Sequence, residues 1–222
     1  MLSSNSSKKT LPRRLPPEVL QNISNTDQKM GTLIKAVGRF NLRDAVATEV
    51  FPSLAESIVY QQLNSRAAET IFRRLLHACS CVSVPISPER VLGCSPAVLR
   101  SAGLSAAKAA ALLDLATKSY AGHIPSIEQM KQLDNDQIVE ALSTVRGIGV
   151  WTAQMFLIFR LRRADVLPES DLSIRKAIMA TYDLSTLPSK DQLVAIGEKW
   201  KPWRTVATWY LYRALDDKIL NN

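Results

Sequence analysis

The chain has 222 residues, of which 28 are Lys or Arg and 20 are Asp or Glu, so its formal net charge is +8 at pH 7. That length suits one domain or two small lobes, and a hydrophobic fraction of 46% can build a buried core, which excludes global disorder. The basic excess favours a polyanionic partner. No apolar stretch reaches the roughly 18–20 residues of a membrane span and no apolar signal segment is seen, so we expect an intracellular protein without a membrane partner.

Cysteine and histidine usage restricts the metal and redox chemistry. Cys79, Cys81 and Cys94 cannot all pair and lack the paired C-x-x-C spacing of zinc ribbons, so we expect reduced thiols. His77 and His123 are the two histidines, and neither has a metal ligand at a suitable spacing. These patterns argue against structural zinc and against catalysis by a histidine dyad.

The N-terminal segment differs in composition from the rest. Residues 1–17 are rich in Ser, Lys, Arg and Pro and contain no acidic residue. Because such a segment buries too little apolar surface to offset its ordering entropy, we predict a flexible basic tail over 1–17 and a folded domain over 18–222. Three roles stay open for the tail: a nuclear address, a weak phosphate-binding arm, or a solvated segment without a function of its own.

Helical periodicity then runs through nearly the whole chain. The apolar positions of residues 65–78 follow the i, i+3, i+4, i+7, i+8 spacing of one helix face, and residues 52–62 repeat this pattern. Ser105 and Asp134 stand where N-caps are expected, each before a further helical pattern. Residues 151–161 are apolar nearly all round, which predicts the central buried helix of the fold. Further helices are predicted over residues 172–181, 190–200 and 203–220.

Strand signals and repeats are missing from the sequence. No segment alternates convincingly between apolar and polar residues, and no repeat occurs at solenoid spacing. The chain holds only eight glycines, which disfavours Rossmann loops and β-barrels. The sequence therefore predicts an all-α globule of about ten helices.

Two of the glycines, Gly147 and Gly149, lie between a helix that ends near Ser143 and one that begins near Val150. Glycine allows another chain to approach the backbone closely, and a helix N-terminus presents free N–H groups and a positive dipole, which together suit a phosphate. For an isolated Gly-x-Gly, an ordinary corner between two helices with glycine C-caps is the simpler interpretation. Asp171, at the start of a later helical pattern, is by itself an N-cap.

These features occur in a fixed order: hairpin, apolar helix, proline loop, capping aspartate. In this order the sequence resembles the helix-hairpin-helix DNA glycosylase superfamily, in its alkylbase (3-methyladenine) branch of bacteria and fungi. The resemblance runs from about residue 50 to residue 213 and rests on four segments. These are Gln-Gln-Leu at 61–63, Arg-Gly-Ile-Gly-Val-Trp-Thr-Ala at 146–153, residues 167–175, and Trp-Lys-Pro-Trp-Arg at 200–204.

The resemblance implies a two-lobed helical fold, with a cleft between two subdomains, and roles for particular residues. Asp171 falls on the catalytic aspartate of the family. Trp151 and Tyr212 fall on aromatic residues of the base pocket. Leu63 falls on the wedge that fills the gap left by an extruded nucleotide, and Asn64 on a minor-groove probe.

The hairpin acquires two implied functions. Its phosphate-contacting residues would be Arg146, Gly147, Ile148 and Gly149. The backbone carbonyls of Ser143, Val145 and Ile148 match positions that hold a monovalent cation, Na⁺ or K⁺, in contact with a DNA phosphate. No cofactor is otherwise expected. Arg146 stands where the family usually has proline, and Ser170 stands where close relatives often have a second aspartate.

The resemblance implies a base-excision-repair enzyme that hydrolyses the N-glycosidic bond of alkylated purines, such as 3-methyladenine and 7-methylguanine, after flipping the nucleotide. Asp171 would stabilise the oxocarbenium-like transition state, because positive charge builds up on the deoxyribose. Trp151 occupies the position of the Schiff-base lysine of bifunctional relatives, so no lyase activity is expected. No C-terminal four-cysteine cluster marks the iron–sulfur branch. The expected protein is a monomer, nuclear in a eukaryote, that acts on double-stranded DNA with alkylated bases or abasic sites.

Two alternatives stay open. A protein of the same fold could recognise abasic or distorted DNA with little or no base excision. A basic α-helical interaction protein without a nucleic-acid role would expose no helix N-terminus at residues 147–149.

Overall fold

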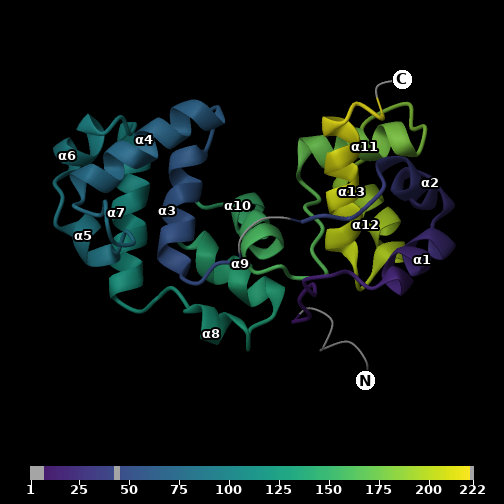
Figure 1. The fold of residues 1–222 in the computed structure, drawn as a ribbon, viewed down its shortest axis with the longest axis horizontal. Helices are drawn as coiled ribbons and strands as arrows, with labels where there is room; N and C mark the ends of the chain where they lie inside the picture. The colour runs from purple at the N-terminus through teal and green to yellow at the C-terminus, as the bar shows by residue number, and fades with distance from the viewer. Residues whose placement is uncertain (1–7, 43–45, 221–222) are drawn as a thin grey trace. The chain divides into compact units, whose positions relative to one another are not determined.

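The computed structural model describes residues 8–42 and 46–220 (Figure 1). The chain divides into two compact units: a terminal unit, Met1–Val46 with Leu157–Asn222, and an inserted unit, Ala47–Phe156. The described residues form thirteen α-helices, one π-helical turn, one 3-10 turn and no strand beyond an isolated β-bridge. The all-α prediction is confirmed. The helices exceed the expected number because three of them, Pro88–Leu92, Pro96–Ser101 and Ile127–Met130, are too short to show periodicity.

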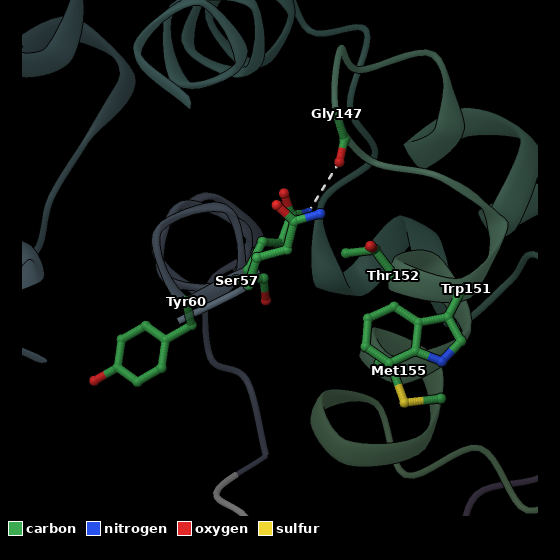
Figure 2. A pocket seen from close by; sticks show the side chains of 8 residues that line it. Ser57, Tyr60, Gly147, Trp151, Thr152 and Met155 are labelled. Atoms are coloured by element: carbon green, nitrogen blue, oxygen red, sulfur yellow. Dashed lines mark hydrogen bonds between the residues drawn. The ribbon is translucent and has the colours of Figure 1, made fainter. Parts of the chain in front are cut away.

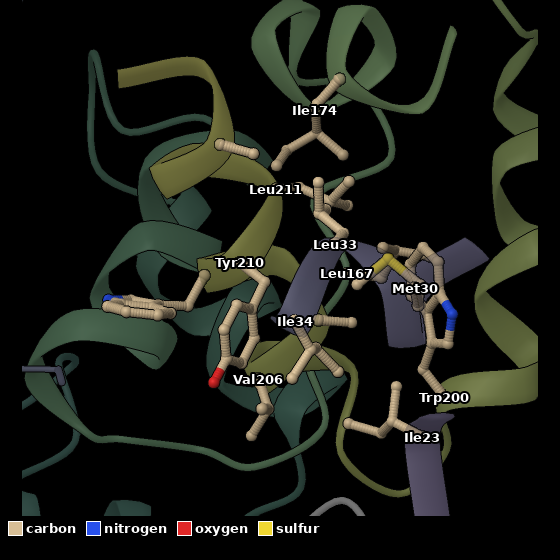
Figure 3. Close-up of a cluster of buried hydrophobic side chains, with 14 of the residues drawn as sticks. Ile23, Met30, Leu33, Ile34, Leu167, Ile174, Trp200, Val206, Tyr210 and Leu211 are labelled. Carbon is tan, nitrogen blue, oxygen red and sulfur yellow. The ribbon is translucent and has the colours of Figure 1, made fainter. Parts of the chain in front are cut away.

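The terminal unit is built around α13. Its elements are α1 (Pro17–Thr26), α2 (Gln28–Val37), α11 (Leu172–Thr181), α12 (Lys190–Gly197), the 3-10 turn η2 (Glu198–Trp200) and α13 (Arg204–Asp216). Every residue from Thr205 to Leu211 is buried, because helices from the two ends of the chain surround α13. Figure 3 shows its Val206, Tyr210 and Leu211 among side chains of α1, α2 and α11.

The inserted unit is arranged around α7. Its helices are α3 (Val50–Tyr60), α4 (Ser65–Ala78), α5 (Pro88–Leu92), α6 (Pro96–Ser101), α7 (Ala106–Tyr120), α8 (Ile127–Met130), α9 (Asn135–Ser143) and α10 (Val150–Met155). In Figure 1, α7 lies among α3, α5 and α6, and it packs against all three. Three of its buried residues are alanines, which let the neighbouring helices approach closely.

The predicted helix starts are confirmed at three positions. Ser105, Asp134 and Asp171 each stand at the N-cap, and their side chains accept hydrogen bonds from the backbone N–H three residues further on, at 3.2, 2.8 and 3.0 Å. Asp134 also forms a reciprocal capping box with Gln137. Local side-chain chemistry therefore determines where α7, α9 and α11 begin.

The apolar stretch 151–161 departs from the expected buried helix. The α-helix ends at Met155, and the π-helical turn η1 (Phe156–Arg160) follows it. Ala153 and residues 156–158 are buried, but Trp151 is 45% exposed. The expectation of a buried helix is wrong for Trp151, because its side chain at the start of α10 faces solvent.

The expectation of a flexible tail is wrong for residues 9–11, while residues 1–7 lie outside the described residues. Thr10 forms a β-bridge with Arg163, and hydrogen bonds join Ala164 N–H to Lys9 O at 2.8 Å and Leu11 N–H to Arg162 O at 2.6 Å. Leu11 is buried in the terminal unit. Backbone pairing and one buried leucine therefore offset the ordering entropy that composition alone suggested was too large.

The described residues contain neither a candidate membrane-spanning helix nor a cluster of metal-ligating side chains. No helix there is long and apolar enough to cross a membrane, and no three His, Cys, Asp or Glu side chains gather as a metal site. The three cysteines are free, and Cys94 Sγ lies 3.4 Å from Cys79 Sγ.

Candidate functional site

The hairpin between α9 and α10 spans residues 144–149 of the inserted unit. Gly147 has a φ of +78°, and a Cβ at this position would lie 3.3 Å from the Cβ of Ala111 on α7, so both conformation and packing favour glycine. Gly149 is the N-cap of α10 and offers no side chain to its first N–H groups. A Cβ at Gly149 would meet nothing within 4 Å, which leaves open space beside the start of the helix.

Side chains hold the hairpin from α7 and from the end of α3. Asp114 Oδ2 accepts from the N–H of Arg146 at 2.7 Å and from Lys118 Nζ at 2.8 Å, and Lys118 also donates to the carbonyl of Thr144. Burial acts to raise the pKa of Asp114, but these hydrogen bonds and the neighbouring positive charges outweigh it and lower the pKa below its usual value. Gln61 Nε2 donates to Gly147 O at 2.9 Å (Figure 2).

The backbone carbonyl oxygens of this hairpin are of the type that binds monovalent cations. Backbone carbonyls are ligands that Na⁺ and K⁺ accept in proteins. Of the expected ligands, the carbonyl of Val145 also accepts from the N–H of Ile148 at 3.0 Å. The hydroxyl of Ser143 is buried and has no hydrogen-bond partner among the described residues, which leaves an unsatisfied oxygen at the end of α9.

A cavity of about 520 Å³ lies beside the hairpin in the inserted unit (Figure 2). Trp151 and Met155 line it from one face of α10, where residues four apart are neighbours. The remaining lining residues come from the end of α3, the two residues after it, the hairpin and α10: Ser57, Tyr60, Gln61, Gln62, Gly147 and Thr152. An exposed indole beside a thioether gives this cavity a polarizable wall of the kind that binds planar and cationic groups.

The turn between α3 and α4, residues 61–64, presents an apolar side chain to solvent; we call it the wedge turn. Gln62 has a φ of +55°, and Leu63 is 39% exposed rather than part of the core. Asn64 is the N-cap of α4, and its Oδ1 accepts from the N–H of Ala67 at 2.9 Å. The capping role of Asn64 was not anticipated, although an Asn before a periodic helix is a recognisable local signal.

Asp171 lies in the terminal unit at the start of α11 and is 7% exposed. Its Oδ1 accepts from the N–H of Ile174 at 3.0 Å, and its Oδ2 accepts from the Tyr212 hydroxyl at 2.9 Å. Tyr212, on α13, also has its ring 6.5 Å from that of Phe159. Asp171 is therefore a buried carboxylate held by two donors, which is more than a helix cap requires.

The segment that leads to Asp171 is supported by residues that sequence reasoning missed. Arg204 donates through Nε and Nη2 to the two oxygens of Asp165, at 2.7 and 3.0 Å, and Asp165 is 5% exposed. The Oγ1 of Thr205 donates to Arg163 O at 2.6 Å and accepts from the N–H of Val166 at 3.1 Å. Only the position of Arg204 in the 200–204 segment could have pointed to this support.

The predicted site residues fall into two groups. The inserted unit holds the wedge turn, the hairpin and Trp151, while the terminal unit holds Asp171 and Tyr212. Trp151 lines the described cavity, and Tyr212 is not among its lining residues. The structure instead joins Tyr212 to the carboxylate of Asp171.

Two helices joined by a Gly-x-Gly hairpin, in an all-α chain with a buried aspartate at the start of a later helix, define a helix-hairpin-helix protein. Residues 55–202 match the model of the HhH-GPD superfamily of base excision DNA repair proteins, and the chain belongs to this superfamily.

Individual proteins are similar to this chain in sequence or structure over most of its length. A DNA-3-methyladenine glycosylase of Schizosaccharomyces pombe is 34% identical over 193 residues, which cover 86% of this chain and 84% of that protein. The solved structure of a 3-methyladenine DNA glycosylase of the same organism, in complex with abasic DNA, has a TM-score of 0.77 and 33% identity, over 90% of this chain and 97% of that one. A DNA-3-methyladenine glycosidase of Bacillus halodurans has a TM-score of 0.79 and 30% identity, over 90% and 89% of the two chains.

Proposed function

We propose that this protein is a monofunctional DNA glycosylase that hydrolyses the N-glycosidic bond of alkylated purines, of the 3-methyladenine and 7-methylguanine type, in base excision repair. The observation that carries the proposal is Asp171, a buried carboxylate held by two hydrogen bonds in a chain of this superfamily. The partner is double-stranded DNA that contains alkylated bases or abasic sites. In a eukaryote such a protein acts in the nucleus, and we propose that it acts as a monomer.

Asp171 supplies the chemistry through its charge. Loss of a purine leaves positive charge on the deoxyribose, and a carboxylate already fixed in place stabilises that charge without a reorganisation cost. The N–H of Ile174 and the hydroxyl of Tyr212 provide this fixation. An alkylated purine carries positive charge before the bond breaks and leaves readily, so a strong general acid is not needed.

The inserted unit supplies the binding steps. Flipping a nucleotide costs a few kcal/mol of stacking, and an apolar side chain such as Leu63 inserted into the gap offsets part of that cost. The cavity beside Trp151 offers an indole face to the flipped base, where a cation–π contact favours a positively charged purine. Trp151 has no amine, so the protein cannot form a Schiff base at this position, and we propose that it lacks lyase activity.

The hairpin contacts a phosphate in this proposal. Arg146, Gly147, Ile148 and Gly149 form the phosphate seat: Arg146 supplies a cationic side chain, and Gly147 and Gly149 supply backbone N–H groups. The N–H groups of Arg146 and Ile148 donate instead to Asp114 and to the carbonyl of Val145. The carbonyls of Ser143, Val145 and Ile148 would hold a Na⁺ or K⁺ ion, which supplies positive charge next to the phosphate. The hydroxyl of Ser143, a separate oxygen of the same residue, is buried without a hydrogen-bond partner among the described residues and could add a further polar contact there. Lys118 and Asp114 hold the hairpin backbone in place.

A second candidate function is recognition of abasic or distorted DNA with little base excision. One observation favours it: both oxygens of Asp171 already accept hydrogen bonds, which draws charge away from the carboxylate. Methylated DNA separates the two functions. A glycosylase releases 3-methyladenine or 7-methylguanine from it in multiple turnovers. A protein that binds an abasic-site duplex tightly but releases no base would establish the second function and remove the first.

A further inference from the structure

The carbonyl groups at the end of α3 lie immediately before the wedge turn. A helix leaves its last four carbonyls without partners inside the helix, and these groups form the negative end of its dipole. At this end of α3, the carbonyls of Val59 and of the C-cap residue Gln61 both accept from the ammonium group of Lys108, at 2.7 and 2.6 Å. Gln61 is the C-cap of the helix and the first residue of the wedge turn.

Lys108 reaches these carbonyls from the first turn of α7. Its backbone N–H is fixed by the Ser105 N-cap, and its side chain crosses to α3. Both acceptors are main-chain oxygens rather than a carboxylate, and burial of the ammonium lowers the pKa of Lys108 below its usual value. A half-buried lysine that donates to two carbonyls of one chain segment holds that segment at a fixed distance from α7.

A second contact joins the wedge turn to the hairpin. The side chain of Gln61 donates through Nε2 to the carbonyl of Gly147 in the hairpin (Figure 2). The backbone carbonyl of Gln61 accepts from Lys108 of α7, so the residue is held on two sides. The two residues that follow are Gln62, in a left-handed conformation, and the exposed Leu63. The bond that closes the turn itself, from Leu63 N–H to Tyr60 O, is long at 3.3 Å. The turn therefore depends on contacts from outside it.

We infer that Lys108 is a positioning residue that keeps the wedge turn in the conformation that presents Leu63 to DNA. The inference rests on the proposed function, because it requires that Leu63 enter the base stack. A wedge displaces stacked bases only if its backbone does not yield, and a turn with a non-glycine residue at positive φ has competing conformations without such support. Lys108 touches no DNA in this arrangement and acts through the two carbonyls.

The test is a double-mutant cycle between Lys108→Met and Leu63→Ala. Methionine keeps most of the length of the side chain and removes the ammonium. The quantity measured is the ratio of affinities for a duplex with a tetrahydrofuran abasic-site analogue and for the intact duplex of the same sequence. Lys131→Met is the matched control, because Lys131 forms an exposed ion pair with Glu128 away from the turn.

We expect Lys108→Met to lower this ratio about tenfold, the value of one or two hydrogen bonds from a charged donor. In the Lys108→Met background, Leu63→Ala should then have little further effect, because the wedge is no longer held. Lys108→Arg, which restores the charge and the donors, should recover most of the ratio. Lys131→Met should leave the ratio unchanged.

If Leu63→Ala lowers the ratio by the same factor in both backgrounds, Lys108 has only a structural role and the inference is overturned. Should Lys108→Met fail to fold, Lys108→Gln enters the same cycle with the same two outcomes. A wild-type protein without any preference for the abasic-site duplex would overturn the proposed function as well as this inference. An additive cycle in a protein that keeps the preference overturns the inference alone.

Discussion

Two regions of the molecule are built in different ways: the wedge turn and hairpin of the inserted unit, and the surroundings of Asp171 in the terminal unit. In the inserted unit, backbone groups and exposed side chains face solvent. Hydrogen bonds from four side chains to the backbone fix this surface; the side chains are those of Lys108, Asp114, Lys118 and Gln61. In the terminal unit the functional group is itself buried and bonded by side chain and backbone. Contact with a duplex needs an accessible surface of fixed shape, whereas stabilisation of a charge needs a fixed carboxylate in a dry environment.

The largest expected effect concerns the buried support of Asp171. Arg204→Met should lower the free energy of unfolding by about 3–5 kcal/mol, because it removes the guanidinium that balances the charge of the buried Asp165 carboxylate. Chemical denaturation measures this change. The exposed ion pair of Lys201 with Glu198 provides the control, and Lys201→Met should cost less than about 1 kcal/mol. An equal loss of unfolding free energy in the two variants would show that the buried ion pair of Arg204 with Asp165 stabilises the protein no more than an exposed pair does.

The next effect separates charge from capping at Asp171. Asparagine is also a good N-cap, so Asp171→Asn should change the melting temperature little while base excision from methylated DNA falls by roughly 10²–10³. Single-turnover kinetics give the rate. Asp134→Asn, the same substitution at the N-cap of α9, should leave the rate unchanged. An Asp171→Asn variant as fast as wild type would show that Asp171 is a helix cap alone.

A smaller effect distinguishes a wedge from a core leucine. Leu63→Ala should cost less than about 1 kcal/mol of stability because the side chain is 39% exposed. Leu54→Ala, on α3 of the same unit and fully buried, should cost about 2–5 kcal/mol. Thermal denaturation compares the two. A loss at Leu63 as large as that at Leu54 would mean that the leucine packs inward and that the wedge assignment is wrong.

The smallest effect is a pH dependence at the hairpin. Because the pKa of Asp114 in the folded protein lies below the ordinary 3.8, its carboxylate stabilises the fold at neutral pH, and this stabilisation disappears as the pH falls through the lowered pKa. Asp114→Asn should therefore be less stable than wild type at pH 7, and the difference should narrow toward pH 3. A difference that stays constant over this range would show that the charge of Asp114 does not hold the hairpin.

Local sequence patterns were sufficient for much of the fold. Apolar spacing predicted α4 and α11 with their observed bounds, and side chains at N-caps marked the starts of α7, α9 and α11. The hairpin followed from two glycines between two helical patterns. These features depend on neighbours within a few residues, so their physics is contained in a short segment of sequence.

The remaining features depend on contacts between distant segments. Tyr212 reaches Asp171 over 41 positions, Lys108 reaches Gln61 over 47, and no periodicity encodes either pairing. The pairing of residues 9–11 with 162–164 was missed for the same reason, since composition reports the average cost of ordering a segment and not the partner that compensates for it.

The division of the chain has a consequence for biosynthesis. The inserted unit is one continuous segment, Ala47–Phe156, whereas the terminal unit combines Met1–Val46 with Leu157–Asn222. On a ribosome, α3 to α10 can pack as soon as they emerge, but α1 and α2 must wait for α13, which is translated after the whole inserted unit and fills their common core. The terminal unit, which carries Asp171, therefore reaches its final packing only after α13 has been translated, and a chain that stops before α13 would hold a folded hairpin without a packed Asp171.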